Sequence, residues 1–137
     1  RHDIPVSAHI GLKPQSVHKS GGFKVQGRDP QKAKEMVAAA KRLESVGADI
    51  VLLECVPNEL GAAVTDALDV PVIGIGAGPD VDGQILVLYD VLGITLGRTP
   101  RFVRNYTPGT DSPLEAVASF VGSVKDKSYP APEHCFS

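Results

Sequence analysis

Several kinds of residue are scarce in this sequence of 137 residues. It contains no Trp, and aromatic residues make up only 5% of it. Its two cysteines, Cys55 and Cys135, show neither a paired framework nor a C-x-x-C spacing. We therefore predict neither a disulfide scaffold nor a zinc site, and a reducing compartment is the default.

Excess charge and long apolar runs are also missing. Fourteen Lys and Arg stand against sixteen Asp and Glu, which gives a net charge of -2, and no run of five or six like charges occurs. A nucleic-acid partner is therefore not expected. The longest mostly apolar runs, around residues 50–55 and 85–88, fall well short of the roughly 20 residues that a membrane-spanning helix needs. We therefore expect a soluble protein that makes no contact with a membrane.

The composition that is present is that of a soluble globular domain, with 42% hydrophobic and 22% charged residues. The chain opens Arg1-His2-Asp3 without a Met, so we expect further sequence to precede it or the chain to be a piece. Pro and Gly divide it into alternating extended and helical segments, which is typical of parallel strands joined by helices.

The individual elements follow from local signals. We expect a helix from about residue 30 to 46, with Asp29 as its N-cap and Pro30 in the first position, and a last helix that starts at an S-x-x-E capping box, Ser112 to Glu115. Residues 82–92 fit a helix or a strand, and a helix is slightly favoured because 94–96 then forms a short fourth strand. The other expected segments are strands at 4–10, 48–56 and 70–76, a helix at 60–68 and an irregular tail at 129–137.

Candidate site residues are those that close the extended segments, because ligands of parallel α/β proteins bind beyond the carboxyl ends of the strands. Glu54 follows the apolar run Ile50-Val51-Leu52-Leu53, so it should be partly desolvated. Desolvation raises the pKa of a carboxyl group toward the range of a general base. The alternative is a Glu paired with a Lys or Arg at the rim.

Four other positions are weaker candidates. His9 is either a substrate-orienting group or a core histidine bonded to neighbouring main chain. Gly76 and Gly78 lie in a G-x-G-x-G run, which differs from the dinucleotide fingerprint, so they either allow the close approach of a ligand or backbone or form a turn. Lys24 belongs to a Gly-rich segment that is either an active-site loop or a connection. Asp82 is a possible helix cap without a catalytic role.

Six ordered motifs together closely resemble the ketopantoate hydroxymethyltransferase family. The resemblance extends over essentially the whole chain and is to the C-terminal half of a TIM-type (β/α)8 barrel, with 1–128 as the half-barrel and 129–137 as the tail. The motifs are AHIGLKPQSV at 8–17, GGFKVQG at 21–27, LECVP at 53–57, IGIGAG at 73–78, DGQILV at 82–87 and EH at 133–134.

This resemblance implies a specific chemistry. The family transfers a one-carbon unit from methylenetetrahydrofolate to 3-methyl-2-oxobutanoate in pantothenate biosynthesis, with a magnesium ion. Glu54 stands at the position of the family's base, and His9 matches a histidine of the substrate pocket. The magnesium ligands belong to the family's N-terminal half, so we expect no metal ligand here and do not promote Asp49, Asp80 or Asp82 to that role.

The resemblance also implies partners and a location. We expect the missing N-terminal half of the barrel, the small-molecule substrates and further copies of the protein as partners, in the cytoplasm or, for a eukaryotic source, the mitochondrion. The isolated chain should be inactive. Two alternatives stay open: a barrel lyase or mutase that acts on phosphoenolpyruvate or another 2-oxo acid, and a half-barrel that serves only in assembly.

Overall fold

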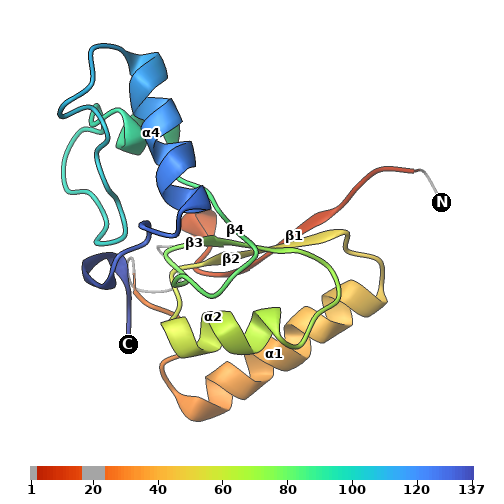
Figure 1. Cartoon of the computed structure of the whole chain (residues 1–137). Coiled ribbons are helices and arrows are strands. Elements are labelled where there is room, and N and C mark those ends of the chain that lie inside the picture. Colours follow the sequence, from red (N-terminus) through yellow and green to blue (C-terminus); the bar gives the residue numbers. More distant parts are fainter. Residues whose placement is uncertain (1–2, 17–23) are drawn as a thin grey trace.

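A computed structural model describes residues 3–16 and 24–137 of the chain (Figure 1). Strands and helices alternate from the first strand to the third, and a short fourth strand and two helices follow. In chain order the elements are β1 (Ser7–Gly11), a 3-10 turn (Pro14–Ser16), α1 (Pro30–Ser45), β2 (Ile50–Glu54), α2 (Asn58–Thr65), β3 (Val72–Ile75), β4 (Gly83–Gln84), α3 (Leu88–Val91), α4 (Pro113–Lys125) and a 3-10 turn (Pro132–His134).

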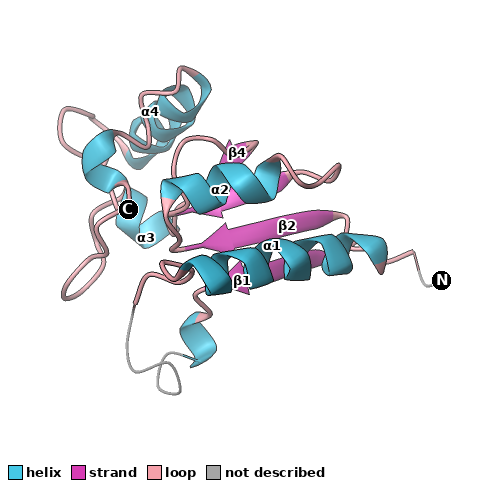
Figure 2. Ribbon diagram, turned by 90° about the horizontal axis from the view of Figure 1, so that it is seen from below, coloured by secondary structure: helices cyan, strands magenta, loops and turns pink. Residues whose placement is uncertain are grey.

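The four strands form one parallel sheet in the order β1-β2-β3-β4. Helices α1 and α2 lie side by side on one face of this sheet, as Figure 2 shows. The register pairs His9 with Leu52 and Gly11 with Glu54, so the carboxyl ends of β1 and β2 finish level with each other. Each strand is followed by its neighbour in the sheet, which is the arrangement of successive βα units.

Local signals explain where the long helices begin. The Asp29 side chain accepts hydrogen bonds from the amides of Gln31 and Lys32, and Pro30 occupies the first turn. These groups satisfy two of the free N–H groups at the start of α1. Ser112 caps α4 in the same way through the amide of Glu115. Both predicted helix starts are confirmed.

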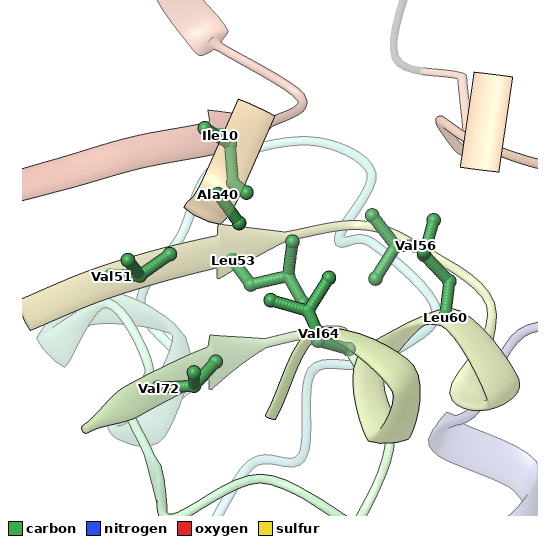
Figure 3. Packing of buried hydrophobic residues seen from close by; sticks show 9 residues of the cluster. Ile10, Ala40, Val51, Leu53, Val56, Leu60, Val64 and Val72 are labelled. Carbon is green, nitrogen blue, oxygen red and sulfur yellow. The ribbon is translucent and has the colours of Figure 1, made fainter. Parts of the chain in front are cut away.

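The main core lies between the sheet and helices α1 and α2 (Figure 3). Alternate residues of β2 point into it, so Val51 and Leu53 are fully buried. From the helices, Ala40 of α1 and Val64 of α2 are fully buried against them. Helices α1 and α2 do not cover the opposite face of the sheet, and Ile50 on that face is 38% exposed. This open face is where polar groups can remain accessible.

The prediction for residues 82–96 is wrong in detail. The fourth strand is β4 at Gly83–Gln84, and only Leu88–Val91 of the expected helix is helical. Residues 94–96 form no strand. The apolar residues 85–88 were compatible with either structure, and the decision comes from the pairing of Gly83 and Gln84 with β3, which periodicity alone does not reveal.

A second, smaller core joins α3, α4 and the tail, by which we mean residues 129–137. Tyr106, Phe120 and Tyr129 pack edge to face, with ring centroids 5.6–6.2 Å apart. The buried hydroxyl of Tyr106 lies 2.6 Å from the hydroxyl of Ser123. The scarce aromatic residues are therefore concentrated in this part of the chain, and the tail is ordered by them although it is irregular.

None of the helices in the described residues has both the length and the apolar character needed to span a bilayer.

Candidate active site

Glu54 and His9 lie on the open face of the sheet at the carboxyl ends of β2 and β1. They lie there because successive side chains of a strand alternate between the two faces of the sheet. Val51 and Leu53 face the helices, so Leu52 and Glu54 face the other way. His9 pairs with Leu52 and therefore shares that face. Two residues 45 positions apart in the sequence thus meet at one edge of the sheet.

The two side chains are in contact. His9 Nε2 lies 3.1 Å from Glu54 Oε2, and the side chains are 28% and 12% exposed. This distance is that of an ion pair, but the ring is not aligned for a hydrogen bond, so His9 Nε2 is buried without a hydrogen-bond partner among the described residues. Burial raises the pKa of Glu54, and the neighbouring His9 opposes part of this rise. The pair therefore joins a carboxyl group of raised pKa to an imidazole nitrogen still able to bond.

Cys55 follows Glu54 in a left-handed conformation, with a φ of 55°. This turn ends β2 directly after Glu54. Burial and the charge of Glu54 raise the pKa of the Cys55 thiol to about 11, and Arg28 opposes part of this rise. The thiol is therefore protonated at neutral pH and is a poor nucleophile.

Gly11 is a site residue that sequence reasoning missed. It has a φ of 87°, and a Cβ atom placed on it would lie 2.2 Å from the carbonyl oxygen of Glu54. The next residue, Leu12, donates a hydrogen bond to the same oxygen at 2.8 Å. Only glycine allows β1 to approach the backbone of Glu54 this closely. A glycine directly after an extended run was the signal that could have found it.

Gly76 and Gly78 have positive φ values of 65° and 84° at the carboxyl end of β3. A Cβ at Gly76 would lie 2.5 Å from the Phe102 ring, and one at Gly78 would lie 2.6 Å from Asn58 Oδ1. The close neighbours are thus side chains of this chain. Asn58 Oδ1 is itself buried without a hydrogen-bond partner in the described part of the chain. A role for either glycine toward a substrate stays a prediction.

The structure gives the remaining candidates other positions. Asp82 accepts a hydrogen bond from the Val72 amide at 2.8 Å, so it holds the amino end of β3 and does not cap a helix. Asp49 accepts one from the Val6 amide, and Asp80 is exposed. Lys24 is exposed, and residues 17–23 of its Gly-rich segment lie outside the described residues.

Within residues 3–16 and 24–137, no group of three or more His, Cys, Asp or Glu side chains gathers as metal ligands would. The residues present therefore do not form a magnesium site, and we derive no step of the chemistry through a metal.

Comparison with known proteins identifies the family. The profile described as ketopantoate hydroxymethyltransferase matches residues 1–132. The chain belongs to the ketopantoate hydroxymethyltransferase family. Among its relatives is the 3-methyl-2-oxobutanoate hydroxymethyltransferase of Chromohalobacter salexigens, 56% identical over 136 residues that make up 99% of this chain and 52% of that protein. The protein of the same name from Marinobacter nauticus is 56% identical over 97% of this chain and 50% of its own length.

The ketopantoate hydroxymethyltransferase family consists of hydroxymethyl transferases, and the names of its members place them in pantothenate biosynthesis. This chain spans about half the length of the relatives that it matches. Four parallel strands that alternate with helices fit half of a (β/α)8 barrel, since a whole barrel needs about 250 residues. The resemblance seen in the sequence is confirmed at the level of family and fold class.

Proposed function

We propose that this chain is the part of a 3-methyl-2-oxobutanoate hydroxymethyltransferase that carries its general base, Glu54. The observation that carries the proposal is a buried carboxyl group at the end of the sheet where ligands of such barrels bind. It lies beside an imidazole nitrogen that forms no aligned hydrogen bond with any described residue. Burial raises the pKa of Glu54, which makes it a stronger base than an exposed carboxylate.

In the proposed reaction Glu54 takes the proton from the carbon next to the carbonyl of 3-methyl-2-oxobutanoate. The resulting enolate carbon forms a bond with the methylene carbon of methylenetetrahydrofolate. The two bonds from that carbon to the folate nitrogens break. Water supplies the hydroxyl group of the product, and the two nitrogens take up the remaining proton of that water and the proton that Glu54 removed. Proton transfer by a well-placed side chain contributes typically 10²- to 10⁴-fold to the rate.

His9 has two tasks in this proposal. Its ring lies against Glu54 and limits the orientations open to the carboxyl group. Its Nε2 atom, which lacks an aligned partner, can donate to an oxygen of the keto acid and hold it against the base. Gly76 and Gly78 shape the neighbouring wall through the close packing of Phe102 and Asn58.

Other components of the reaction are assigned to the rest of the protein. The ligands of the magnesium ion that the family resemblance implies belong, in our proposal, to the N-terminal half of the barrel. The same half, the keto acid and the folate donor are the proposed partners, with assembly into a homo-oligomer in the cytoplasm. We propose that the chain alone does not turn over.

The test uses a chimera in which this chain replaces the segment of the Chromohalobacter salexigens relative that it matches over 136 residues. The chimera should form ketopantoate from 3-methyl-2-oxobutanoate and methylenetetrahydrofolate. Glu54→Gln should lower kcat by about 100-fold or more, because the amide cannot accept the proton. Glu59→Gln, the same substitution at an exposed glutamate of α2, serves as the matched control and should leave kcat unchanged.

The outcomes separate the alternatives. A chimera that folds but shows no transfer contradicts the proposal, and lyase or mutase activity on a phosphorylated 2-oxo acid would favour that alternative. Full activity of the Glu54→Gln chimera would reduce this half-barrel to an assembly role. Turnover by the 137-residue chain alone would contradict its dependence on the other half.

A further inference from the structure

The tail, residues 129–137, returns to the carboxyl ends of the strands. The C-terminus and the arrowheads of the strands lie at the same end of the molecule in Figure 2. Main-chain carbonyl groups of the tail accept three hydrogen bonds from distant segments. The donors are the amide of Asn58 to Phe136 O at 3.0 Å, Arg28 Nε to Ser137 O at 2.9 Å and Arg101 Nε to Glu133 O at 3.1 Å.

The first of these hydrogen bonds acts close to the proposed base. Asn58 is the first residue of α2, four positions after Glu54. The intervening residues Cys55 and Val56 donate hydrogen bonds to Ile75 O and Gly76 O at 2.9 and 3.0 Å, which join the end of β2 to the end of β3. A bond that fixes Asn58 therefore fixes one side of the turn that presents Glu54.

A second line of contacts reaches β3 through aromatic rings. The Phe136 ring packs edge to face on the Phe102 ring, with centroids 6.4 Å apart. Phe102 is 5% exposed, and its ring lies against Gly76, where a Cβ atom would come within 2.5 Å. The hydroxyl of Tyr129 donates to Phe102 O at 2.6 Å. Residues near both ends of the tail, Tyr129 and Phe136, therefore contact Phe102, which packs against the end of β3.

We propose that the tail is a strap that positions the carboxyl ends of β2 and β3, and that Phe136 is the positioning residue that joins them. Its carbonyl group holds the start of α2 and its ring supports Phe102 on Gly76. The proposal rests on the proposed function of Glu54 for its effect on catalysis. Its effect on the strand ends is independent of that function.

The most direct test removes the backbone N–H group of residue 58. Asn58→Pro deletes the donor to Phe136 O at the first helical position, where proline is well tolerated. The preceding residue, Pro57, already has φ −58° and ψ 149°, the conformation that a following proline requires. Asn58→Ala is the matched control, since it also removes the side chain but keeps the donor.

We expect kcat of the Asn58→Pro chimera to be about 10-fold below that of the Asn58→Ala chimera, a misplacement effect, because both variants lose the side chain and only Asn58→Pro loses the donor. KM for the keto acid should be similar in the two variants. Amide hydrogen exchange at Cys55 and Val56 should accelerate only in Asn58→Pro. Equal kcat and equal exchange in the two variants would overturn the strap. If the unsubstituted chimera shows no transfer, the proposed function fails, and the exchange measurement still decides the strap.

Substitutions of Phe136 provide the second arm. Phe136→Ala should reduce kcat about as much as Asn58→Pro, and Phe136→Tyr, which keeps the ring edge against Phe102, should restore it. Leu43→Ala controls for stability alone, because Leu43 packs on the main core in the last turns of α1. Loss of kcat in Leu43→Ala equal to that in Phe136→Ala, at a comparable drop in Tm, would make the role of Phe136 merely structural and contradict the proposal.

Discussion

Acidic side chains at the two ends of the parallel strands differ in their hydrogen bonding. We call the end where the strands begin the amino edge of the sheet and the end where they finish its carboxyl edge. At the amino edge, carboxylates accept backbone hydrogen bonds: Asp49 from Val6, Asp82 from Val72, and Glu44 from Asp69 and Val70 at 2.7 and 2.9 Å. At the carboxyl edge, Glu54 is desolvated beside His9, whose Nε2 has no aligned partner in the described structure. Satisfied carboxylates stabilise a fold, whereas an incompletely satisfied one is available to a substrate. The division matches the barrel rule that the amino edge serves stability and the carboxyl edge catalysis.

The largest expected effect on stability is at Gly11, where the carboxyl edge depends on a close backbone approach. Gly11→Ala should destabilise the chimera by about 3 kcal/mol or more, because the new methyl group meets Glu54 O while φ is positive. Denaturant unfolding measures the change. Gly97→Ala is the control: its φ is 89°, but a Cβ there meets nothing within 4 Å, so it should cost only about 1 kcal/mol. Equal losses would show that the contact with Glu54 is unimportant.

The amino edge offers the converse test. Asp82→Ala removes the acceptor of the Val72 amide and should lower the free energy of unfolding by about 1 kcal/mol, with kcat unchanged. Asp80→Ala, at an exposed position two residues away, should change neither quantity. A large fall in kcat for Asp82→Ala would show that the two edges are not functionally separate.

How much of the fold and of the candidate site the sequence predicts depends on how far apart in the chain the interacting residues lie. The N-caps Asp29 and Ser112 act on residues two or three positions away, so local pattern reveals them. The predicted capping box is only half present, because Glu115 accepts from the amide of Asp111 and not from that of Ser112. The amide of Asp111, one residue before Ser112, is an alternative donor to Glu115, and the capping-box motif does not include it.

The sequence does not predict which strands pair with each other or in what register. The strand ends placed Glu54 and His9 near one edge, but their contact depends on the pairing of His9 with Leu52. The contact of Gly11 with the Glu54 carbonyl has the same origin. The apolar run at 85–88 fits two structures, and β4 is settled by its pairing with β3. In each case the missing information is which strand is the neighbour and in what register.

A smaller effect is expected when His9 is replaced. The proximity of His9 lowers the pKa of Glu54 against the larger effect of burial. His9→Gln removes that opposition, so the pKa of Glu54 should rise and the acidic limb of the pH profile of kcat should move to higher pH. Steady-state rates across the acidic range measure it. Movement of the limb to lower pH would show that His9 does not stabilise the charged form of Glu54.

The smallest expected effect is on the pH dependence of stability. Because burial raises the pKa of Glu54 in the folded state above that in the unfolded chain, the unfolded state gives up this proton first as pH increases. The contribution of Glu54 to stability is therefore fully present below its ordinary pKa and is lost as pH rises through the folded value. Glu54→Gln cannot ionise, so the difference in unfolding free energy between the variant and the unsubstituted chimera should grow in favour of the variant over that interval. Asp82→Ala supplies the contrast, since it removes a hydrogen-bond acceptor of the Val72 amide at the amino edge. The contradicting outcome is a difference in unfolding free energy between Glu54→Gln and the unsubstituted chimera that stays constant at all pH values. Glu54 would then be as well solvated in the fold as in the unfolded chain. The two edges would in that case not differ electrostatically.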